Sequence, residues 1–135
     1  MGNQITTAAI HHLTLTVSDV RRSQDFYSKL LNFSHVTDFG DRAILSNGSV
    51  MLVLTPPPDP AQAISGDVFD ENRIGLDHVS LNVGSVRDLH VAVALFDQHD
   101  VEHGEINNLQ PFGIYVLAFR DPDNIQVELT APHDS

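Results

Sequence analysis

The chain has 135 residues, which is enough for one compact domain with a real core and too few for two domains of ordinary size. Its formal net charge is −11, with 18 Asp and Glu against seven Lys and Arg, and such a surface repels the phosphate backbone of nucleic acids. Cysteine is absent, which excludes disulfides and thiolate metal ligands and agrees with a reducing cytoplasm.

No apolar run approaches the roughly 20 residues that cross a bilayer. The N-terminal stretch lacks the basic and then apolar segments of a secretory signal. We therefore expect a cytoplasmic protein without membrane or nucleic-acid partners. Its acidic surface favours solubility and attracts cations, either metals or positively charged small molecules.

The first predicted unit covers residues 10–55 and has the order βαβββ. Residues 10–17 alternate between apolar and polar, which is typical of a strand with one face on a core. Ser18 and Asp19 offer caps to a helix over 20–31. In the first strand the apolar face carries Leu13, Leu15 and Val17, and the polar face carries His12, Thr14 and Thr16. Three shorter strands follow at 34–39, 42–46 and 50–55.

A connecting segment at 56–75 is rich in Pro, Gly and Asp, which disfavour a central strand and favour turns. It is long for an idle loop, so we expect either a simple connection with a short helix or a lid. A second unit over 76–131 then repeats the order of the first. Its predicted elements are a strand at 76–83, a helix at 86–99 capped by Ser85, and strands at 101–106, 113–120 and 125–130.

The two units share a sequence pattern. HLTLTVSDVR at 12–21 and HVSLNVGSVR at 78–87 match at five of ten positions, so that His12 aligns with His78. An offset near half the chain length indicates two copies of one supersecondary unit. The sequence therefore predicts an α+β fold in which two βαβββ modules form a curved mixed sheet around a cleft, within a single domain of residues 1–135.

The polar strand faces carry His12, His78 and Glu128. Two imidazoles and one carboxylate bind Fe(II), Mn(II), Ni(II), Co(II) or Zn(II) and leave positions open for substrate. A lone His on a strand is more often a surface residue, and a lone Glu usually faces solvent, so the matching phase in both repeats carries the prediction. His11 becomes the rival ligand if the strand register slips by one residue.

The last strands of the two units, VMLVLT at 50–55 and IQVELT at 125–130, also align. Val53 then takes the place of Glu128, and Met51 takes the place of Gln126. This pattern fits simple drift in a buried strand, and it equally fits an apolar wall for an aromatic or aliphatic substrate. The residues expected to line the substrate pocket are Thr14, Met51, Val53, Ser80 and Gln126.

The repeat, the HLTLTVSDV opening, the FYSKLLNF helix end and the FRDPDNIQVEL close resemble the vicinal oxygen chelate superfamily, over about residues 10–131. That superfamily includes glyoxalase I, bleomycin-resistance proteins, fosfomycin-resistance enzymes and extradiol dioxygenases. The resemblance implies paired βαβββ modules, a homodimer, and His12, His78 and Glu128 as metal ligands. Asn32 and Asn124 stand where the family often has Gly, and Asn also tolerates a left-handed backbone.

Val53 stands where glyoxalase I usually has an acidic or amide side chain, which argues against its proton-shuttling reaction. The sequence thus favours a metal-dependent enzyme acting on a small molecule with neighbouring oxygens, dioxygenase-like or lyase-like. Tyr115 and Arg120 are candidates for assisting groups, but they lie in opposite phase on one strand. A non-catalytic protein that sequesters a cationic antibiotic, as in bleomycin resistance, is the alternative, and an inactive metal-bearing scaffold is a third.

Overall fold

The computed structural model describes residues 2–133 and separates them into two compact units, the first ending at Ala63 and the second beginning at Ile64. This boundary lies within the connecting segment predicted at 56–75. The sequence predicts that the two units associate into a single domain over residues 1–135, and this stays a prediction. Across the described part of the chain, no helix combines the length and apolar character that a membrane crossing requires.

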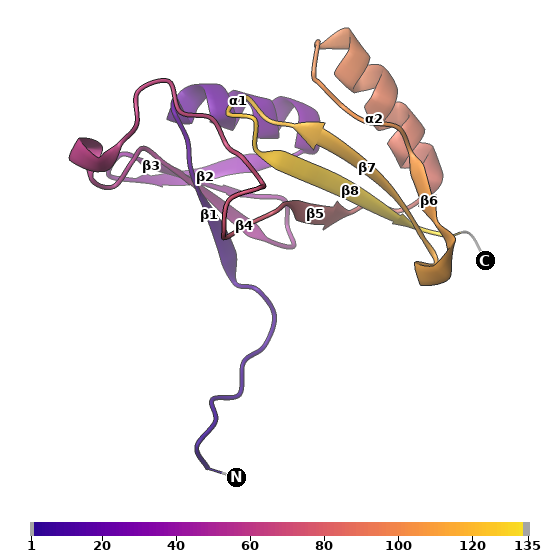
Figure 1. Ribbon diagram of the computed structural model, residues 1–135, viewed down its shortest axis with the longest axis horizontal. Coiled ribbons are helices and arrows are strands. Elements are labelled where there is room, and N and C mark those ends of the chain that lie inside the picture. The colour runs from indigo at the N-terminus through magenta and orange to yellow at the C-terminus, as the bar shows by residue number, and fades with distance from the viewer. Residues whose placement is uncertain (1, 134–135) are drawn as a thin grey trace. The chain divides into compact units, whose positions relative to one another are not determined.

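The first unit is a four-stranded mixed sheet with one helix (Figure 1). The strands lie in the order β1-β4-β3-β2; β1 pairs with β4 in parallel, and the other pairs are antiparallel. The elements are β1 (His12–Thr16), α1 (Val20–Leu31), β2 (Ser34–Phe39), β3 (Arg42–Ser46) and β4 (Met51–Thr55), followed by the 3₁₀ turn η1 (Pro60–Gln62).

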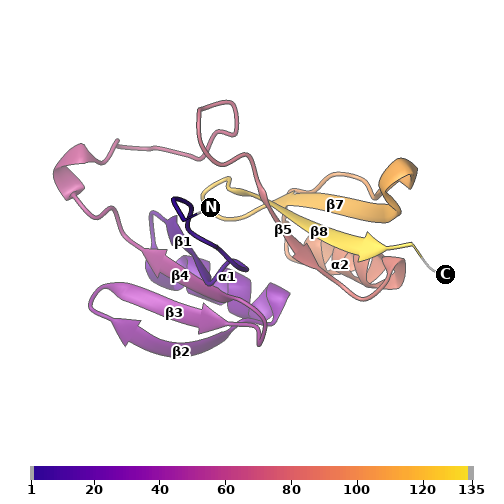
Figure 2. The ribbon, with the colours of Figure 1, turned by 90° about the horizontal axis from the view of Figure 1, so that it is seen from below.

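The second unit repeats this topology (Figure 2). Its sheet has the order β5-β8-β7-β6, with β5 parallel to β8 and the remaining pairs antiparallel. The elements are β5 (Val79–Asn82), α2 (Val86–Gln98), β6 (Asn107–Leu109), the 3₁₀ turn η2 (Gln110–Phe112), β7 (Ile114–Arg120) and β8 (Gln126–Pro132). The identical strand order confirms the predicted duplication and the α+β class with two βαβββ modules.

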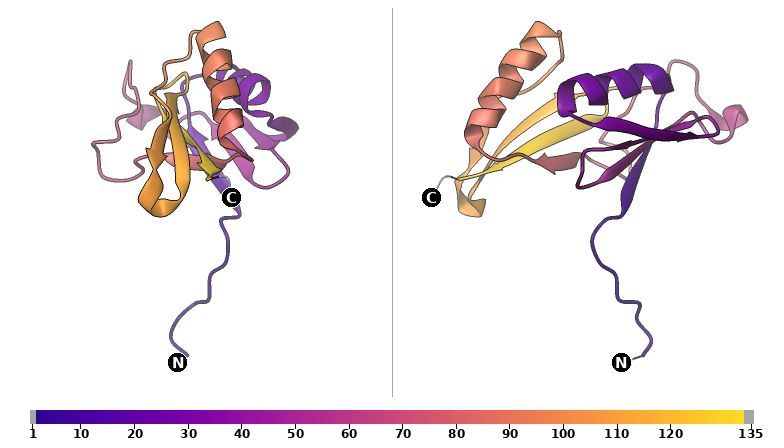
Figure 3. Two further views of the ribbon diagram at one scale, coloured as in Figure 1. Left: turned by 90° about the vertical axis from the view of Figure 1, so that its right-hand side faces the viewer. Right: turned by 180° about the vertical axis from the view of Figure 1, so that it is seen from behind.

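Each sheet buries one face under its own helix. α1 packs on β2, β3 and β4, and α2 packs on β7 and β8 (Figure 3). Leu15, Leu52 and Leu54 are buried in the first unit, and Val127, Leu129 and Phe96 are buried in the second. On the opposite faces, His12 and Thr14 of β1 and Ser80 of β5 are exposed, and the alternate residues of β4 and most of those of β8 are half-buried. Strand periodicity therefore places the apolar and polar faces as the sequence predicts.

Local capping explains why the helices begin and end where they do. The carboxylate of Asp19 accepts a hydrogen bond of 3.1 Å from the backbone N–H of Arg22. The carboxylate of Asp88 accepts hydrogen bonds of 3.1 Å from the backbone N–H groups of Gly84 and Ser85. Asn32 ends α1 in the left-handed conformation with φ of 60°, so the expected tolerance of Asn at this turn is confirmed.

The strand predicted at 101–106 is wrong, since the edge strand β6 begins only at Asn107. Within the predicted range the sole ladder contact is an isolated bridge between His103 and Phe119. Asp100 has a positive φ of 55°, and both ring nitrogens of His103 are engaged locally, with Asp97 and with the Gly104 carbonyl. The chain meets β7 there only around this bridge, through backbone hydrogen bonds from Gly104 to the carbonyl of Ala118 at 2.8 Å and from Arg120 to the carbonyl of Glu102 at 2.9 Å, and regular pairing begins at Asn107.

Candidate metal centre

The register of the parallel strand pairs shows which positions on the polar faces of the two units are equivalent in the repeat. Thr14 pairs with Val53 in the first unit, and Ser80 pairs with Glu128 in the second. Thr14 and Ser80 are the same position of the repeat, two residues after His12 and His78 respectively. Val53 therefore occupies the place of Glu128, as the alignment of the last strands predicts, and only the second unit carries a carboxylate at this point.

His78 and Glu128 lie together on the polar face of the second unit. His78 immediately precedes β5, and its Nε2 atom is 3.7 Å from Oε1 of Glu128 on β8. The side chain of Glu128 is 19% exposed and that of His78 is 39% exposed. Two ligands bound at about 2.0–2.1 Å in tetrahedral or octahedral geometry lie roughly 2.8–3.4 Å apart. A small side-chain rotation therefore brings this pair to the spacing of two ligands of one ion.

The other ring nitrogen of His78 is engaged. Nδ1 lies 2.8 Å from Oδ1 of Asp77, and Nε2 of Gln126 donates to the same carboxylate oxygen at 3.0 Å. An ionised carboxylate only accepts hydrogen bonds, so Nδ1 of His78 carries a proton, and in the neutral imidazole Nε2 is the nitrogen with the free lone pair. The atom of His78 that faces Glu128 is thus the one able to bind a metal.

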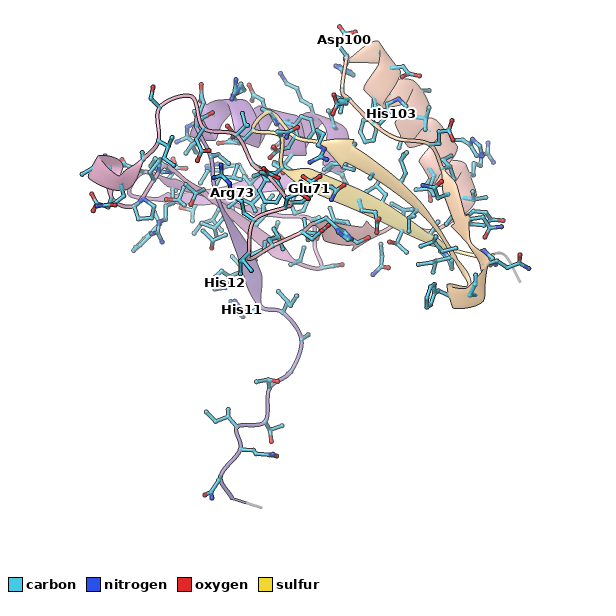
Figure 4. All side chains as sticks on the ribbon, viewed as in Figure 1. His11, His12, Glu71, Arg73, Asp100 and His103 are labelled. Atoms are coloured by element: carbon cyan, nitrogen blue, oxygen red, sulfur yellow. The ribbon has the colours of Figure 1, made fainter. Side chains whose placement is uncertain are left out.

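His12 opens β1 in the first unit, and His11 stands directly before it (Figure 4). Nδ1 of His12 is 2.9 Å from Nδ1 of His11, so one ring donates a hydrogen bond to the other. His12 pairs with Met51 in the strand register, which gives it the phase of Thr14 on the exposed face. His11 lies outside the strand.

The donor set of the second unit fits a divalent ion in part, because it supplies one imidazole and one carboxylate. Among residues 2–133, no three His, Cys, Asp or Glu side chains gather into one cluster that could hold a metal. His78 and Glu128 belong to one unit and His12 to the other. The assignment of His12, His78 and Glu128 as a three-residue metal site therefore stays a prediction.

The residues expected to line the substrate pocket all lie on the polar faces of their own sheets. Met51 and Val53 are half-buried, and Thr14 is exposed. Ser80 and Thr130 are joined through their hydroxyl groups, so Ser80 contributes to a polar strip beside Glu128. Gln126 donates its amide to Asp77, by a bond of 3.0 Å to the carboxylate and one of 3.3 Å to the backbone carbonyl.

The two candidate assisting residues on β7 point to different faces. Arg120 pairs with Gln126 and so shares the face of Glu128. Tyr115 pairs with the buried Ala131 on the helix face, and its ring lies 4.6 Å from that of His133. Of these two side chains, only Arg120 lies on the polar face.

Arg120 is held by the connecting segment. Nη1 and Nη2 of Arg120 donate to Oε1 and Oε2 of Glu71, each at 2.9 Å. These hydrogen bonds, more than the charge attraction, lower the pKa of Glu71 from 4.5 to about 2 and raise the pKa of Arg120. Such a bidentate pair fixes the guanidinium in one orientation.

The same segment is attached to the turn between β7 and β8. The backbone N–H of Phe69 donates to the carbonyl of Asp123 at 2.9 Å, and the side-chain amide of Asn124 donates to the carbonyl of Phe69 at 3.0 Å. Asn124 itself has φ of 66°, as expected for a residue in place of Gly. The segment around 69–71 is thus a fixed part of the second unit, and a lid role for the rest of 56–75 stays a prediction.

Sequence reasoning missed Asp77 and Glu71. The adjacency of Asp77 to His78 was a usable signal, because a carboxylate next to a ligand histidine commonly orients its ring. Glu71 gave no such signal, since its partner lies 49 residues away.

Comparison with known proteins gives consistent results. A sequence model of the Glyoxalase/Bleomycin resistance protein/Dioxygenase superfamily matches residues 9–129. A glyoxylase/bleomycin resistance protein/dioxygenase domain from Frankia sp. EAN1pec is 26% identical, with a TM-score of 0.78 and 96% of each chain covered. A lactoylglutathione lyase from Agrobacterium tumefaciens is 20% identical, with a TM-score of 0.71 and coverage of 93% and 94%.

A fosfomycin resistance protein from Listeria monocytogenes, whose structure is complexed with Mn(II) and a sulfate ion, is 15% identical. It has a TM-score of 0.74, with 94% of this chain and 92% of that chain covered. Comparison with curated protein sequences gave no match. The likenesses to the Agrobacterium and Listeria proteins, at such low identity, show a shared fold and nothing further.

Proposed function

Because this chain belongs to the Glyoxalase/Bleomycin resistance protein/Dioxygenase superfamily, we propose that it is a divalent-metal-dependent enzyme acting on a small molecule with two neighbouring oxygens. In this proposal His12, His78 and Glu128 are the metal ligands, and the polar sheet faces line the substrate site. The supporting observation is the pair His78 and Glu128, whose Nε2 and Oε1 atoms lie 3.7 Å apart while Nδ1 of His78 is engaged by Asp77.

A bound Fe(II), Mn(II), Ni(II), Co(II) or Zn(II) ion supplies Lewis acidity toward the two substrate oxygens. The residues of the chain supply the rest. His78 and Glu128 present one neutral and one anionic donor, and Met51 and Val53 give an apolar surface for the carbon skeleton of the substrate. Arg120 is occupied by Glu71, so its role is to order the edge of the site.

The reaction type follows from what the first unit lacks. Val53 stands at the position of Glu128 in the repeat, so no carboxylate is available there to move a proton. We therefore favour chemistry in which the metal stabilises an anion of the substrate, as in a dioxygenase or a lyase, over a glyoxalase-type isomerisation. The Mn(II) in the structure of the Listeria relative makes a hard divalent ion a reasonable first test.

Metal content tests this proposal. The protein is purified without added metal, and elemental analysis compares the wild type with His78→Ala and with His90→Ala, an exposed residue of α2 that serves as the control. We expect near-stoichiometric metal in the wild type and in the control, and a large loss in His78→Ala. Equal metal occupancy in all three proteins would contradict the proposed ligand set.

A second candidate function rests on charge. The net charge of −11 and the half-buried Met51 and Val53 suit a planar cationic antibiotic held without catalysis. Calorimetry with a cationic glycopeptide on metal-stripped protein tests this function. Tight binding that persists in His78→Ala supports a sequestering protein, and the absence of heat across the accessible concentration range removes the option.

We also propose that the chain forms a homodimer, with the ligands from the two units combining either within one chain or between two chains. The support for this proposal is that the chain belongs to a superfamily whose small members pair such modules within or between chains.

A further inference from the structure

We propose that Asp77 is a positioning residue that fixes Nε2 of His78 as the metal-binding atom, and that Gln126 holds Asp77 in place for this task. The inference rests on the proposed metal site and adds a supporting layer that the ligand set alone does not contain. It concerns the second unit only, so it does not depend on how the two units associate.

The first step is the tautomer of His78. A neutral imidazole carries one proton, which sits on either ring nitrogen. Asp77 places Oδ1 at 2.8 Å from Nδ1, where a carboxylate can only accept a hydrogen bond. The proton is therefore held on Nδ1, and the lone pair of Nε2 points toward Glu128, 3.7 Å away.

The second step is the fixation of Asp77 itself. Its side chain is 67% exposed, and a contact with a neighbouring histidine alone does not restrict an exposed carboxylate to one rotamer. Gln126 adds the missing restriction, because its amide donates to Oδ1 of Asp77 at 3.0 Å and to the backbone carbonyl of Asp77 at 3.3 Å. Gln126 lies on β8 two residues before Glu128, so one strand positions both the carboxylate ligand and the clamp on Asp77.

The third step compares the repeats. In the alignment of His12 with His78, Asp77 corresponds to His11, and His11 also contacts Nδ1 of the following histidine, at 2.9 Å. The first unit has Met51 in place of Gln126, which has no N–H to donate. Only the second unit therefore combines an acceptor on the imidazole with a clamp from the neighbouring strand, and the preorganised half of the site lies there.

Two variants separate positioning from simple charge. Asp77→Ala removes both the acceptor and the negative charge, whereas Asp77→Asn removes the charge and keeps an oxygen that can accept from Nδ1. Asp67→Asn serves as the control, because Asp67 is an exposed carboxylate of the connecting segment at 56–75, outside the proposed site, and lies 4.0 Å from Arg73. If Asp77 acts through its hydrogen bond, Asp77→Asn falls between the wild type and Asp77→Ala.

The first readout is free of metal. Long-range ¹H–¹⁵N spectra of the metal-stripped full chain at pH 8 report the tautomer of each imidazole, with His78 assigned from the spectrum of His78→Gln. We expect the Nδ1–H tautomer in the wild type and in Asp67→Asn, and a mixture or the Nε2–H tautomer in Asp77→Ala. The Nε2–H tautomer in the wild type would overturn the inference.

The second readout is the affinity for Zn(II) and Mn(II), each measured by calorimetry. We expect Asp77→Ala to weaken binding about 10–100-fold, as removal of a group that orients a ligand histidine usually does. If His78→Ala abolishes metal binding while Asp77→Ala binds metal within about twofold of the wild-type affinity, the inference is also overturned. A wild type that binds no metal rejects the proposed function instead, and the tautomer of His78 still decides whether Asp77 positions the ring.

Discussion

Glu71 and Arg120 are joined by two hydrogen bonds of 2.9 Å, which fasten the connecting segment to the end of β7. Both side chains are about a quarter exposed, so solvent and salt screen the charge attraction, and the fork of hydrogen bonds is the larger part of the contact. Because Arg120 lies on the face of Glu128, this clamp also sets the edge of the proposed site.

The first prediction follows from the pKa of Glu71, which this clamp lowers from 4.5 to about 2. A lowered folded pKa stabilises the fold above the unfolded value, and the contribution is lost as the pH falls through the folded value. The difference in urea midpoint between the wild type and Glu71→Gln should therefore be constant above pH 5 and shrink between pH 4.5 and pH 2. A difference that stays constant down to pH 3 contradicts the clamp.

The second prediction concerns His103, whose Nε2 lies 2.7 Å from the carboxylate of Asp97 and whose Nδ1 lies 2.7 Å from the carbonyl of Gly104. Only the imidazolium can donate to both, and these bonds, first of all the one to Asp97, raise its pKa above 6.5. The stabilisation is complete below pH 6.5 and is lost as the pH rises through the folded pKa. Urea denaturation of the wild type and Asp97→Asn should thus give the largest difference at pH 6 and a smaller one at pH 9.

His90→Gln is the control for this experiment, since His90 is exposed on α2, the helix that also carries Asp97. An NMR titration of His103 provides a direct check. A midpoint at or below 6.5 is incompatible with the two hydrogen bonds.

The third prediction concerns the turn between β7 and β8. Asp121 is only 5% exposed, and its Oδ1 accepts from the backbone N–H groups of Asp123 and Ile125 at 2.8 and 2.9 Å. Asp121→Ala leaves both donors without this acceptor and should lower the free energy of unfolding by about 2 kcal/mol. Asp121→Asn keeps an acceptor oxygen and should cost less, and equal losses in the two variants would contradict this interpretation.

The parts of the fold that depend on local sequence were predictable. The helix predicted at 20–31 is observed as Val20–Leu31, because the residues that end it, Asp19 and Asn32, act within one turn of it. The alternation in 10–17 gave the exposed and buried faces of β1, and the aligned strand ends gave the equivalence of Val53 and Glu128 before any register was known. These features need only periodicity and neighbouring residues.

The features that depend on distant pairs were not predictable. The strand expected at 101–106 is reduced to a single bridge between His103 and Phe119, because its pairing with β7 is interrupted before Asn107, which alternation alone does not reveal. The clamp between Glu71 and Arg120 and the bond from Gln126 to Asp77 each join residues 49 apart in sequence. Composition and periodicity carry no information about such contacts, although the bond from Gln126 to Asp77 belongs to the arrangement that we propose orients His78.

The last prediction asks which chains supply the three proposed ligands. His12→Ala and His78→Ala each remove one ligand, so neither homodimer should hold metal normally. If each site takes His12 from one chain and His78 with Glu128 from the other, a mixed dimer regains one complete site of its two. After random exchange, half of the dimers are mixed, and about a quarter of the wild-type metal should return.

If all three ligands come from one chain, every chain in the mixture lacks a ligand and no metal returns. Elemental analysis after co-refolding the two variants from urea and removing free metal distinguishes the two arrangements, and co-refolded wild type sets the full value. A mixture of His12→Ala with Glu71→Gln provides the control, because Glu71→Gln keeps every proposed ligand and should retain metal in either arrangement. Full occupancy in either His homodimer would reject the three-ligand site altogether.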